Sequence, residues 1–177
     1  MLTAWRLVHK RKVDEAFTDT GSRRYGGRWN YKGIGVVYVS DSLALAAFEI
    51  IVHAASYQAL RDYVSIKVIF PKALVVDVND IARLPKDWQA DSPPIKLKET
   101  GKIWYFDQIS AVLKVPSTII PTECNYVLNP GHPGFKKVAV KPVVKMKQKY
   151  GFIANPGFKK VAVKQAMPFK FDQRLNR

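Results

Sequence analysis

The 177-residue sequence has a single cysteine, Cys124, so the chain cannot form an intrachain disulfide bond, and a reducing compartment is favoured. It also lacks any run of about 18 apolar residues, the length that a membrane-spanning helix needs. The first residues, MLTAWRLVHKRKV, contain no apolar stretch as long as that of a secretory signal peptide. These absences predict a cytoplasmic protein with no membrane segment.

Several common catalytic motifs are missing as well. The three histidines and one cysteine show no HExxH or CxxC spacing, so no metal site is expected. The sequence has no GxGxxG loop, no Walker-type loop and no GxSxG elbow. These absences argue against a Rossmann dinucleotide site, a nucleoside triphosphatase and a serine hydrolase of the α/β type.

Acidic residues are scarce: 14 Asp and Glu stand against 29 Lys and Arg, which gives a net charge of +15. Most of the excess lies in the basic C-terminal region, residues 132–177, where Asp172 is the only acidic residue among twelve Lys and Arg. Such a block fits a nucleic acid, an acidic partner or a solvated surface. The same region contains the octapeptide GFKKVAVK twice, at 134–141 and 157–164. We expect one copy to hold a strand position and the other to be an addition.

The order of apolar patterns predicts one α+β domain over residues 1–177. Strands are expected at 3–9, 35–40, 63–70 and 73–78, with short ones at 116–121 and 125–130. Helices are expected at 42–56 and 101–114, and a surface loop at 85–102. Because strands and helices do not alternate regularly, we expect mixed or antiparallel sheets rather than a doubly wound parallel sheet.

The stretch RRYGGRWNYKG, residues 23–33, combines three arginines, three aromatic residues and three glycines. Glycine allows the backbone to approach a ligand closely, and arginine offers a planar pair of donors to phosphate oxygens. Aromatic faces interleaved with cations also suit nucleic-acid bases. Composition alone therefore leaves two possibilities for this loop, the binding of a small anion and the binding of a nucleic acid.

The helix expected at 42–56 is apolar at nearly every position, a pattern typical of a buried helix. Its polar exceptions include Ser42, Glu49 and His53, whose spacings of seven and four place them on one face. A carboxylate on an apolar helix is costly unless it has a partner or faces a wet pocket. Glu49 is therefore one half of a salt bridge with an arginine, a side chain that reaches the surface, or a functional group.

The segment GGRWNYKGIGVVYVSDSLALAAFEIIVH, followed by VPSTIIPTECNYVLNPGHPGF, resembles the RES-domain family of toxins. The ending PFKFDQRL fits the same family, which is named after an arginine, a glutamate and a serine. These match Arg28, Glu49 and Ser117. The resemblance implies a fold similar to that of ADP-ribosyltransferases and a toxin that degrades NAD, its substrate, without a metal. It also implies a partner, an antitoxin with an Xre-type helix-turn-helix domain that covers the active site and makes any contact with nucleic acid.

The residue chemistry is compatible with NAD cleavage. Arg28 suits the pyrophosphate, and the face of Tyr38 suits the cationic nicotinamide ring. Glu49 can stabilise the positive charge that develops on the ribose when its bond to nicotinamide breaks. These three residues are the catalytic candidates. The further candidates for substrate binding are Arg6, Asn30, His53, Ser117 and Asn125.

Other functions stay open at this point. NAD hydrolysis, phosphorolysis and ADP-ribosylation of a protein would use the same site, and the sequence does not separate them. A nucleic-acid-binding or RNA-cleaving toxin is supported by the net charge and by the loop at 23–33. A non-catalytic module that docks an acidic partner is the third class, although it gives Glu49 no role.

Overall fold

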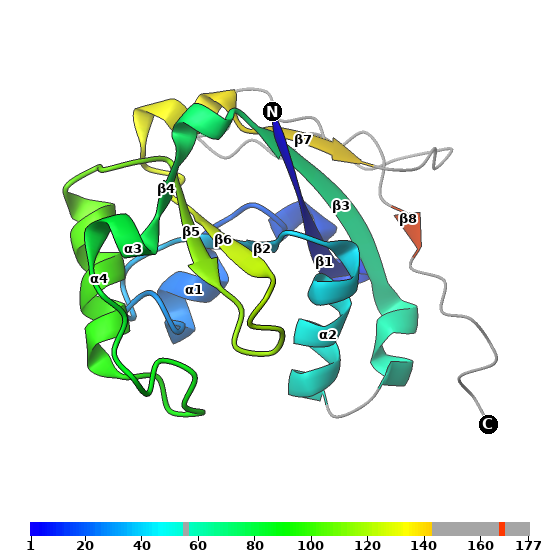
Figure 1. Cartoon of the computed structure of the whole chain (residues 1–177). Coiled ribbons are helices and arrows are strands. Elements are labelled where there is room, and N and C mark those ends of the chain that lie inside the picture. The colour runs from blue at the N-terminus through cyan, green and yellow to red at the C-terminus, as the bar shows by residue number, and fades with distance from the viewer. Residues whose placement is uncertain (55–56, 143–166, 169–177) are drawn as a thin grey trace.

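The computed structural model describes residues 1–54, 57–142 and 167–168, and its first strand leads into two short helices before the loop that carries Arg28 (Figure 1). The strands are β1 (Leu2–His9), β2 (Val37–Ser40), β3 (Tyr63–Phe70), β4 (Val75–Asp77), β5 (Val112–Pro116), β6 (Cys124–Leu128), β7 (Ala139–Pro142) and β8 (Met167–Pro168). The α-helices are α1 (Thr20–Tyr25), α2 (Leu43–Ala54), α3 (Val78–Ile81) and α4 (Ile95–Phe106). Four short 3-10 helices complete the set: η1 (Lys10–Glu15), η2 (Tyr57–Asp62), η3 (Lys72–Leu74) and η4 (Pro133–Lys137).

All described strands belong to one sheet, in the order β4-β5-β6-β2-β1-β3-β7, with β8 also paired to β3. The β4–β5 pair is parallel, and the other pairs are antiparallel. β1 and β3 pair over eight residues, whereas β1 and β2 share a single bridge, Trp5 opposite Ser40. Apart from this bridge, β2, the strand that carries Tyr38, is not paired with β1.

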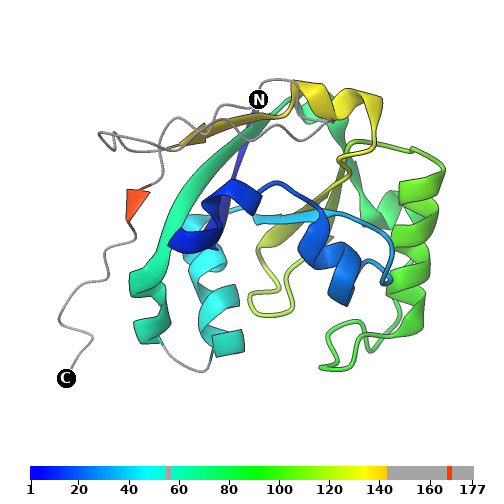
Figure 2. The same ribbon diagram turned by 180° about the vertical axis from the view of Figure 1, so that it is seen from behind.

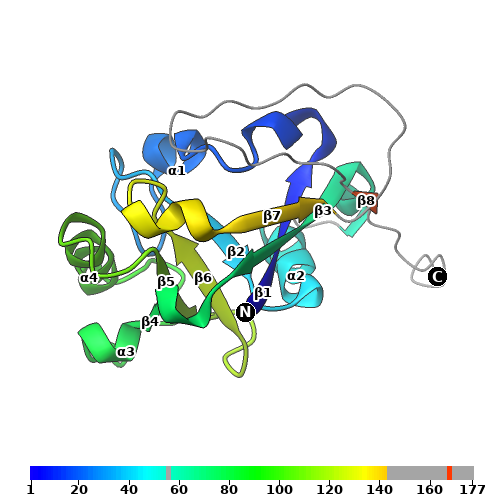
Figure 3. The ribbon, with the colours of Figure 1, turned by 90° about the horizontal axis from the view of Figure 1, so that it is seen from above.

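The two faces of the sheet are covered by different elements. α2 packs on the face that carries Trp5 and Leu7 of β1. On the same face, Leu113 of β5 and Val127 of β6 join a cluster that includes Trp104 of α4. Figure 1 shows α2 and α4 to either side of the β5–β6 connection. η1 and α1 lie on the other side of the sheet from α2: they are in front in Figure 2, which is seen from behind, and at the top of Figure 3. The stretch of sheet between α2 and α4 belongs to β2 and β6.

The predicted α+β architecture is confirmed, and most strands lie close to where the sequence places them. The strand predicted at 63–70 matches β3, and those at 3–9 and 125–130 match β1 and β6 to within two residues. Their β-branched and aromatic residues alternate between the sheet faces, as strands require.

Three predicted elements need correction: the loop at 85–102, the helix at 101–114 and the strand at 116–121. α4 begins at Ile95, inside the expected loop. Pro94 is its N-cap, and since a residue that precedes a proline is disfavoured in a helix, the helix does not extend back over Pro93. α4 ends at Phe106, and residues 112–116 form β5 between β4 and β6 instead of continuing the helix. The strand expected at 116–121 is a turn, since Oγ of Ser117 accepts the backbone N–H groups of Ile119 and Ile120.

α2 is also less buried than its composition predicts. Ala46 and Ala47 are packed in the core, but Phe48 and Val52 keep 47% and 57% of their surface exposed. The helix covers the sheet with one side only, so its opposite side, lined by Ala44, Phe48 and Val52 at successive turns, faces outward. Residues 55–56 of the predicted helix lie outside the described residues.

The first copy of the repeated octapeptide is built into the core. Phe135, Val138 and Val140 are buried, and β7 pairs with β3 from Ile66 to Ile69. The second copy, most of the ending PFKFDQRL and most of the basic C-terminal region lie outside the described residues. β8 continues along the same edge of β3, because Pro142 is opposite Ile66 and Met167 is opposite Ser65. No helix in the described part of the chain is long and apolar enough to cross a membrane.

Candidate active site

Glu49 is oriented by two side chains at the two ends of the β5–β6 connection, Ser117 just after β5 and Asn125 in β6. Its Oε1 atom accepts a hydrogen bond from Nδ2 of Asn125 at 2.8 Å and lies 3.5 Å from Oγ of Ser117. The first bond is well formed, and the second is at the limit of a hydrogen bond. Both donors reach Oε1, so Oε2 has no hydrogen-bond partner among the described residues. The half-buried carboxylate thus keeps one oxygen for another group.

The start of α2 holds Glu49 in place from the other direction. Oγ of Ser42 accepts the backbone N–H of Leu45 at 3.0 Å, which makes Ser42 the N-cap of the helix. The same hydroxyl donates to Oε2 of Glu123 at 2.6 Å. Because residues 117–125 bind both Ser42 and Glu49, the helix and the β5–β6 connection are tied together twice.

Tyr38 lies next to this pair on the same face of the sheet. In the β2–β6 ladder, Tyr38 is opposite Val127 and Ser40 is opposite Asn125. Tyr38 and Asn125 are therefore diagonal neighbours, about 7–8 Å apart between their Cα atoms. The Tyr38 hydroxyl donates to Oδ1 of Asn30 at 2.7 Å and accepts the N–H of Trp29 at 3.2 Å. Burial raises the pKa of Tyr38 above its usual value, so this hydroxyl stays protonated near neutral pH.

Arg28 joins Tyr38 from the loop between α1 and β2. Its Nη1 atom donates to the backbone carbonyls of Trp88 and Ala90, at 2.9 and 3.0 Å. Both of these bonds use Nη1, and among the described residues neither Nη2 nor Nε has a hydrogen-bond partner. Burial raises the pKa of Tyr38, and the positive charge of Arg28 lowers it to a lesser degree. The backbone N–H of Trp29, the residue after Arg28, binds the Tyr38 hydroxyl, so the loop that carries Arg28 contacts this tyrosine. The bonds from Arg28 to Trp88 and Ala90 could not be predicted from the sequence, because every residue type has a backbone carbonyl.

Neither Arg6 nor Asn30 is exposed on the face of the sheet that carries Tyr38 and Asn125. Arg6 alternates with Trp5 and Leu7 and so points to the face away from α2, with its guanidinium 5.9 Å from the centre of the Phe17 ring. Its Nη1 donates to the carbonyl of Tyr38 at 3.0 Å, where the β1–β2 ladder opens. Burial lowers the pKa of Arg6 to about 10, so Arg6 is charged at neutral pH. The Asn30 side chain is fully buried beneath Tyr38.

His53 is exposed one turn beyond Glu49 on α2, as the spacing predicts. The structure therefore brings Glu49, Ser117 and Asn125 together, with Tyr38 on the same face of the sheet and Arg28 in the loop that contacts the Tyr38 hydroxyl. Arg6 lies across the sheet, Asn30 lies beneath the site, and His53 lies at its outer edge. Within residues 1–54 and 57–142, no group of three or more His, Cys, Asp or Glu is arranged to hold a metal ion.

Comparisons with known proteins agree on one family. The RES domain model matches residues 3–151. A Photorhabdus laumondii protein named Toxin Res is 38% identical over 133 residues, which span 75% of this chain and 85% of that protein. A Sphingobium protein named Prs ADP-ribosylating toxin is 32% identical over 145 residues, which span 80% of this chain and 90% of that protein.

A solved structure has the same fold. A chain in the crystal structure of the M. tuberculosis MbcT-MbcA toxin-antitoxin complex superimposes with a TM-score of 0.62 at 18% identity, covering 78% of this chain and 80% of that chain. This likeness confirms the expected ADP-ribosyltransferase-like α+β fold.

Proposed function

Because the chain belongs to the RES domain family, we propose that it is the toxin of a toxin–antitoxin pair and that it cleaves the nicotinamide–ribose bond of NAD. The observation that carries this proposal is the setting of Glu49. One carboxylate oxygen is bound by Asn125, and the other has no partner among the described residues. Tyr38 lies on the same sheet face as Asn125. The names of the relatives from Photorhabdus and Sphingobium support a toxin of this kind.

Each of the three residues has a separate task in this reaction. Arg28 binds the pyrophosphate through Nη2 and Nε, while the carbonyls of Trp88 and Ala90 hold its Nη1. The ring of Tyr38 stacks on the nicotinamide and attracts its positive charge. Because its hydroxyl is bound by Asn30 and Trp29, Tyr38 contributes its ring rather than a proton.

Glu49 acts on the bond that breaks. The electron pair of the ribose C1–nitrogen bond leaves with nicotinamide, and the ribose gains oxocarbenium character. The fixed carboxylate stabilises this positive charge, and Oε2 is free to bind a ribose hydroxyl. Water then adds to C1 and loses a proton, which yields ADP-ribose. Inorganic phosphate in place of water would give the phosphorolysis product.

A second candidate reaction uses the same site. Transfer of ADP-ribose to a protein side chain differs only in the nucleophile that attacks C1. The Sphingobium relative, whose name describes an ADP-ribosylating toxin, favours this alternative. We propose NAD degradation as the main activity and protein ADP-ribosylation as the alternative.

We also propose a cytoplasmic location and an antitoxin partner with an Xre-type helix-turn-helix domain. The solved structure with the same fold is a toxin-antitoxin complex. In this chain, Phe48 and Val52 expose apolar surface on the same helix as Glu49. A partner that covers them would contact α2, the helix that carries Glu49.

One experiment tests the proposed function. The purified full chain is incubated with NAD, with and without phosphate or candidate acceptor proteins, and nicotinamide release is followed with the ribose product. Free ADP-ribose indicates hydrolysis, a phosphorylated ADP-ribose indicates phosphorolysis, and a modified protein indicates transfer. Intact NAD in every arm would reject the proposal. A salt-dependent affinity for RNA in that case would favour the nucleic-acid alternative.

A further inference from the structure

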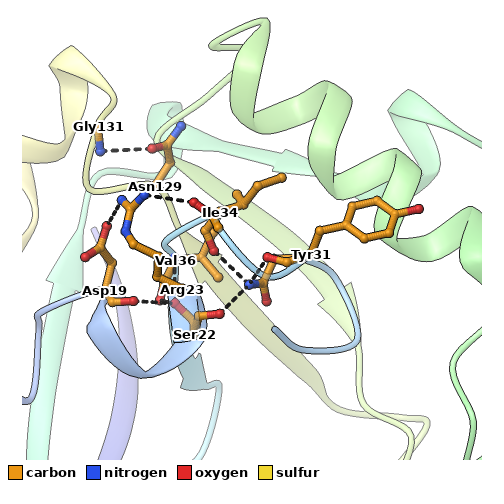
Figure 4. A network of polar contacts seen from close by, with 10 residues as sticks. Asp19, Ser22, Arg23, Tyr31, Ile34, Val36, Asn129 and Gly131 are labelled. Carbon is orange, nitrogen blue, oxygen red and sulfur yellow. Dashed lines mark hydrogen bonds and ion pairs between the residues drawn. The ribbon is translucent and has the colours of Figure 1, made fainter. Parts of the chain in front are cut away.

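Asn30 makes an unusually complete set of hydrogen bonds for a side chain next to a candidate active site. Its Nδ2 atom lies 3.0 Å from the carbonyl oxygen of Ser22, 3.2 Å from that of Tyr31 and 2.8 Å from that of Ile34. Figure 4 shows Ser22, Tyr31 and Ile34 gathered around one amide nitrogen. The side chain has no exposed surface, so its bonds are made entirely within the protein.

This surrounding fixes the direction of the amide. Nδ2 faces three carbonyl oxygens, and an inverted amide would place Oδ1 against all three. Oδ1 must therefore point to Tyr38, whose hydroxyl donates to it at 2.7 Å. The hydroxyl oxygen also accepts the N–H of Trp29 at 3.2 Å. The Tyr38 hydroxyl thus has both a fixed acceptor and a fixed donor.

The loop closes tightly over the same hydroxyl. A Cβ atom at Gly27 would lie 2.6 Å from Oη of Tyr38 and 2.8 Å from Oδ1 of Asn30, so only glycine fits there. Gly27 and Trp29 flank Arg28 in the sequence, and both contact Tyr38. The position of Arg28 relative to the tyrosine ring is therefore set by the Tyr38–Asn30 pair.

A second set of contacts anchors this pair to α1. Oγ of Ser22 donates to the carbonyl of Val36 at 2.6 Å and accepts the N–H of Val36 at 2.8 Å. Arg23 donates to the carbonyl of Gly33 at 2.8 Å and forms an ion pair with Asp19 (Figure 4). The end of the loop that leads into β2 is thereby held against α1.

We propose that Asn30 is a positioning residue for substrate binding: through the hydroxyl of Tyr38 it fixes the Arg28 loop over the tyrosine ring, so that both groups meet the dinucleotide together. This inference rests on the proposed function and gives Asn30 a role different from the substrate contact that the sequence predicts. Asn30 acts through Tyr38 and Arg28, so its loss weakens substrate capture more than the chemical step.

The test compares Asn30→Ala, Tyr38→Phe and the double variant, with Tyr31→Phe as the matched control. Tyr31 lies in the same loop, but its hydroxyl donates to Glu99 at 2.6 Å instead of to Asn30. We expect each single variant to raise KM for NAD by about tenfold, the value of one buried hydrogen bond, with kcat within about twofold. The double variant should raise KM by less than the product of the two single effects, because both changes break the same bond between Tyr38 and Asn30. Asn30→Ala also removes the three Nδ2 contacts, so its effect should be the larger of the two.

A readout independent of NAD separates this inference from the proposed function. Hydrogen–deuterium exchange at residues 27–31 should rise in Asn30→Ala and Tyr38→Phe and stay at the parent level in Tyr31→Phe. Unchanged exchange, a loss confined to kcat, or fully additive KM effects would each overturn the inference. If Asn30→Ala fails to fold, Tyr38→Phe carries both measurements. Faster exchange in a protein whose parent does not use NAD would reject the proposed function while leaving the loop contact established.

Discussion

Nδ2 of Asn125 binds Oε1 of Glu49 at 2.8 Å and so joins the middle of an apolar helix to a central strand of the sheet. This bond holds Oε1 against the protein, whereas Oε2 has no hydrogen bond to the described residues. Glu49 comes from α2 and Asn125 from β6, elements that are far apart in the sequence. The candidate site therefore depends on how α2 docks on the sheet.

Replacing the carboxylate should remove activity and leave the fold intact. We expect Glu49→Gln to lower the rate of NAD cleavage by about 10² or more, because an amide cannot stabilise a developing cation as a carboxylate does. Growth arrest on expression should disappear as well. Glu123→Gln is the matched control, since Glu123 accepts a bond from Ser42 and not from the site. NAD consumption by Glu49→Gln at the parent rate would show that Glu49 has no catalytic role.

Asn125 and Ser117, the two donors to Glu49, should differ in how far their removal lowers kcat. Asn125→Ala removes a 2.8 Å bond and should lower kcat by about tenfold, because the carboxylate loses its orientation. Ser117→Ala removes a contact of 3.5 Å and should affect kcat less. Its main effect should be a lower melting temperature, since the Ser117 hydroxyl also holds the N–H groups of Ile119 and Ile120. Steady-state kinetics and thermal unfolding of both variants check this order, and a reversed order of kcat losses would contradict it.

Arg28 should act on substrate capture. We expect Arg28→Ala to raise KM for NAD by about tenfold or more, because the charged hydrogen bonds to the pyrophosphate are lost. Arg28→Lys should recover only part of this loss, since lysine cannot donate to Trp88 and Ala90 and to phosphate in the same planar arrangement. Arg24→Ala is the control, because the Arg24 guanidinium lies over the exposed Tyr25 ring. Normal saturation by NAD in Arg28→Ala would argue against a phosphate contact.

Acid should weaken the fold partly through Asp77. Burial alone would raise the pKa of Asp77, but hydrogen bonds from Asn79 and Lys114 outweigh it and hold this pKa below its usual value. A carboxyl with a lowered pKa stabilises the fold above its unfolded pKa of about 3.9, and this stabilisation is lost as the pH falls. Asp77→Asn should therefore lower stability at pH 7 by less than about 1 kcal/mol, because the pair with Lys114 is partly exposed.

Thermal unfolding at pH 7 and near pH 3 checks the Asp77 prediction. Asparagine can still cap α3, so this substitution isolates the charge from the helix cap. The parent and Asp77→Asn should differ at pH 7 and converge in acid. An equal difference at both pH values would assign the effect to packing instead of charge.

Local patterns predict much of this fold, and long-range contacts account for what they miss. The strand at 63–70 is predictable because its β-branched residues alternate with the faces of a sheet. The helix predicted at 101–114 fails at its end, because residues 112–116 are held as a strand by β4 and β6, which sequence spacing does not reveal. Gly101 sits inside α4 for a similar reason: a Cβ there would overlap the carbonyl of Trp29.

The same division applies to the candidate site. The spacing of Ser42 and Glu49 on one helix face is readable from the sequence, because it follows from helical periodicity. The anchoring of Arg28 by Trp88 and Ala90 is not readable, since the acceptors are backbone atoms some sixty positions away. The sequence predicts that Arg6 binds substrate, because it is an arginine on a predicted strand. Its side chain lies on the other face of the sheet, near Phe17.

The edge of β3 has a consequence for how this chain can change in length. Pro142 and Met167 face adjacent residues of β3, so the sheet holds them as consecutive positions of one strand. Residues 143–166, which include six lysines and no acidic residue, thus begin and end at one point on the rim. We expect a chain without them to fold and to cleave NAD as the parent does, with a net charge of +9 in place of +15. If this shortened chain failed to fold, Pro142 and Met167 could not be joined directly by a peptide bond. We therefore expect that peptide tags or reporter domains can be inserted between Pro142 and Met167 without altering the distances within the candidate site.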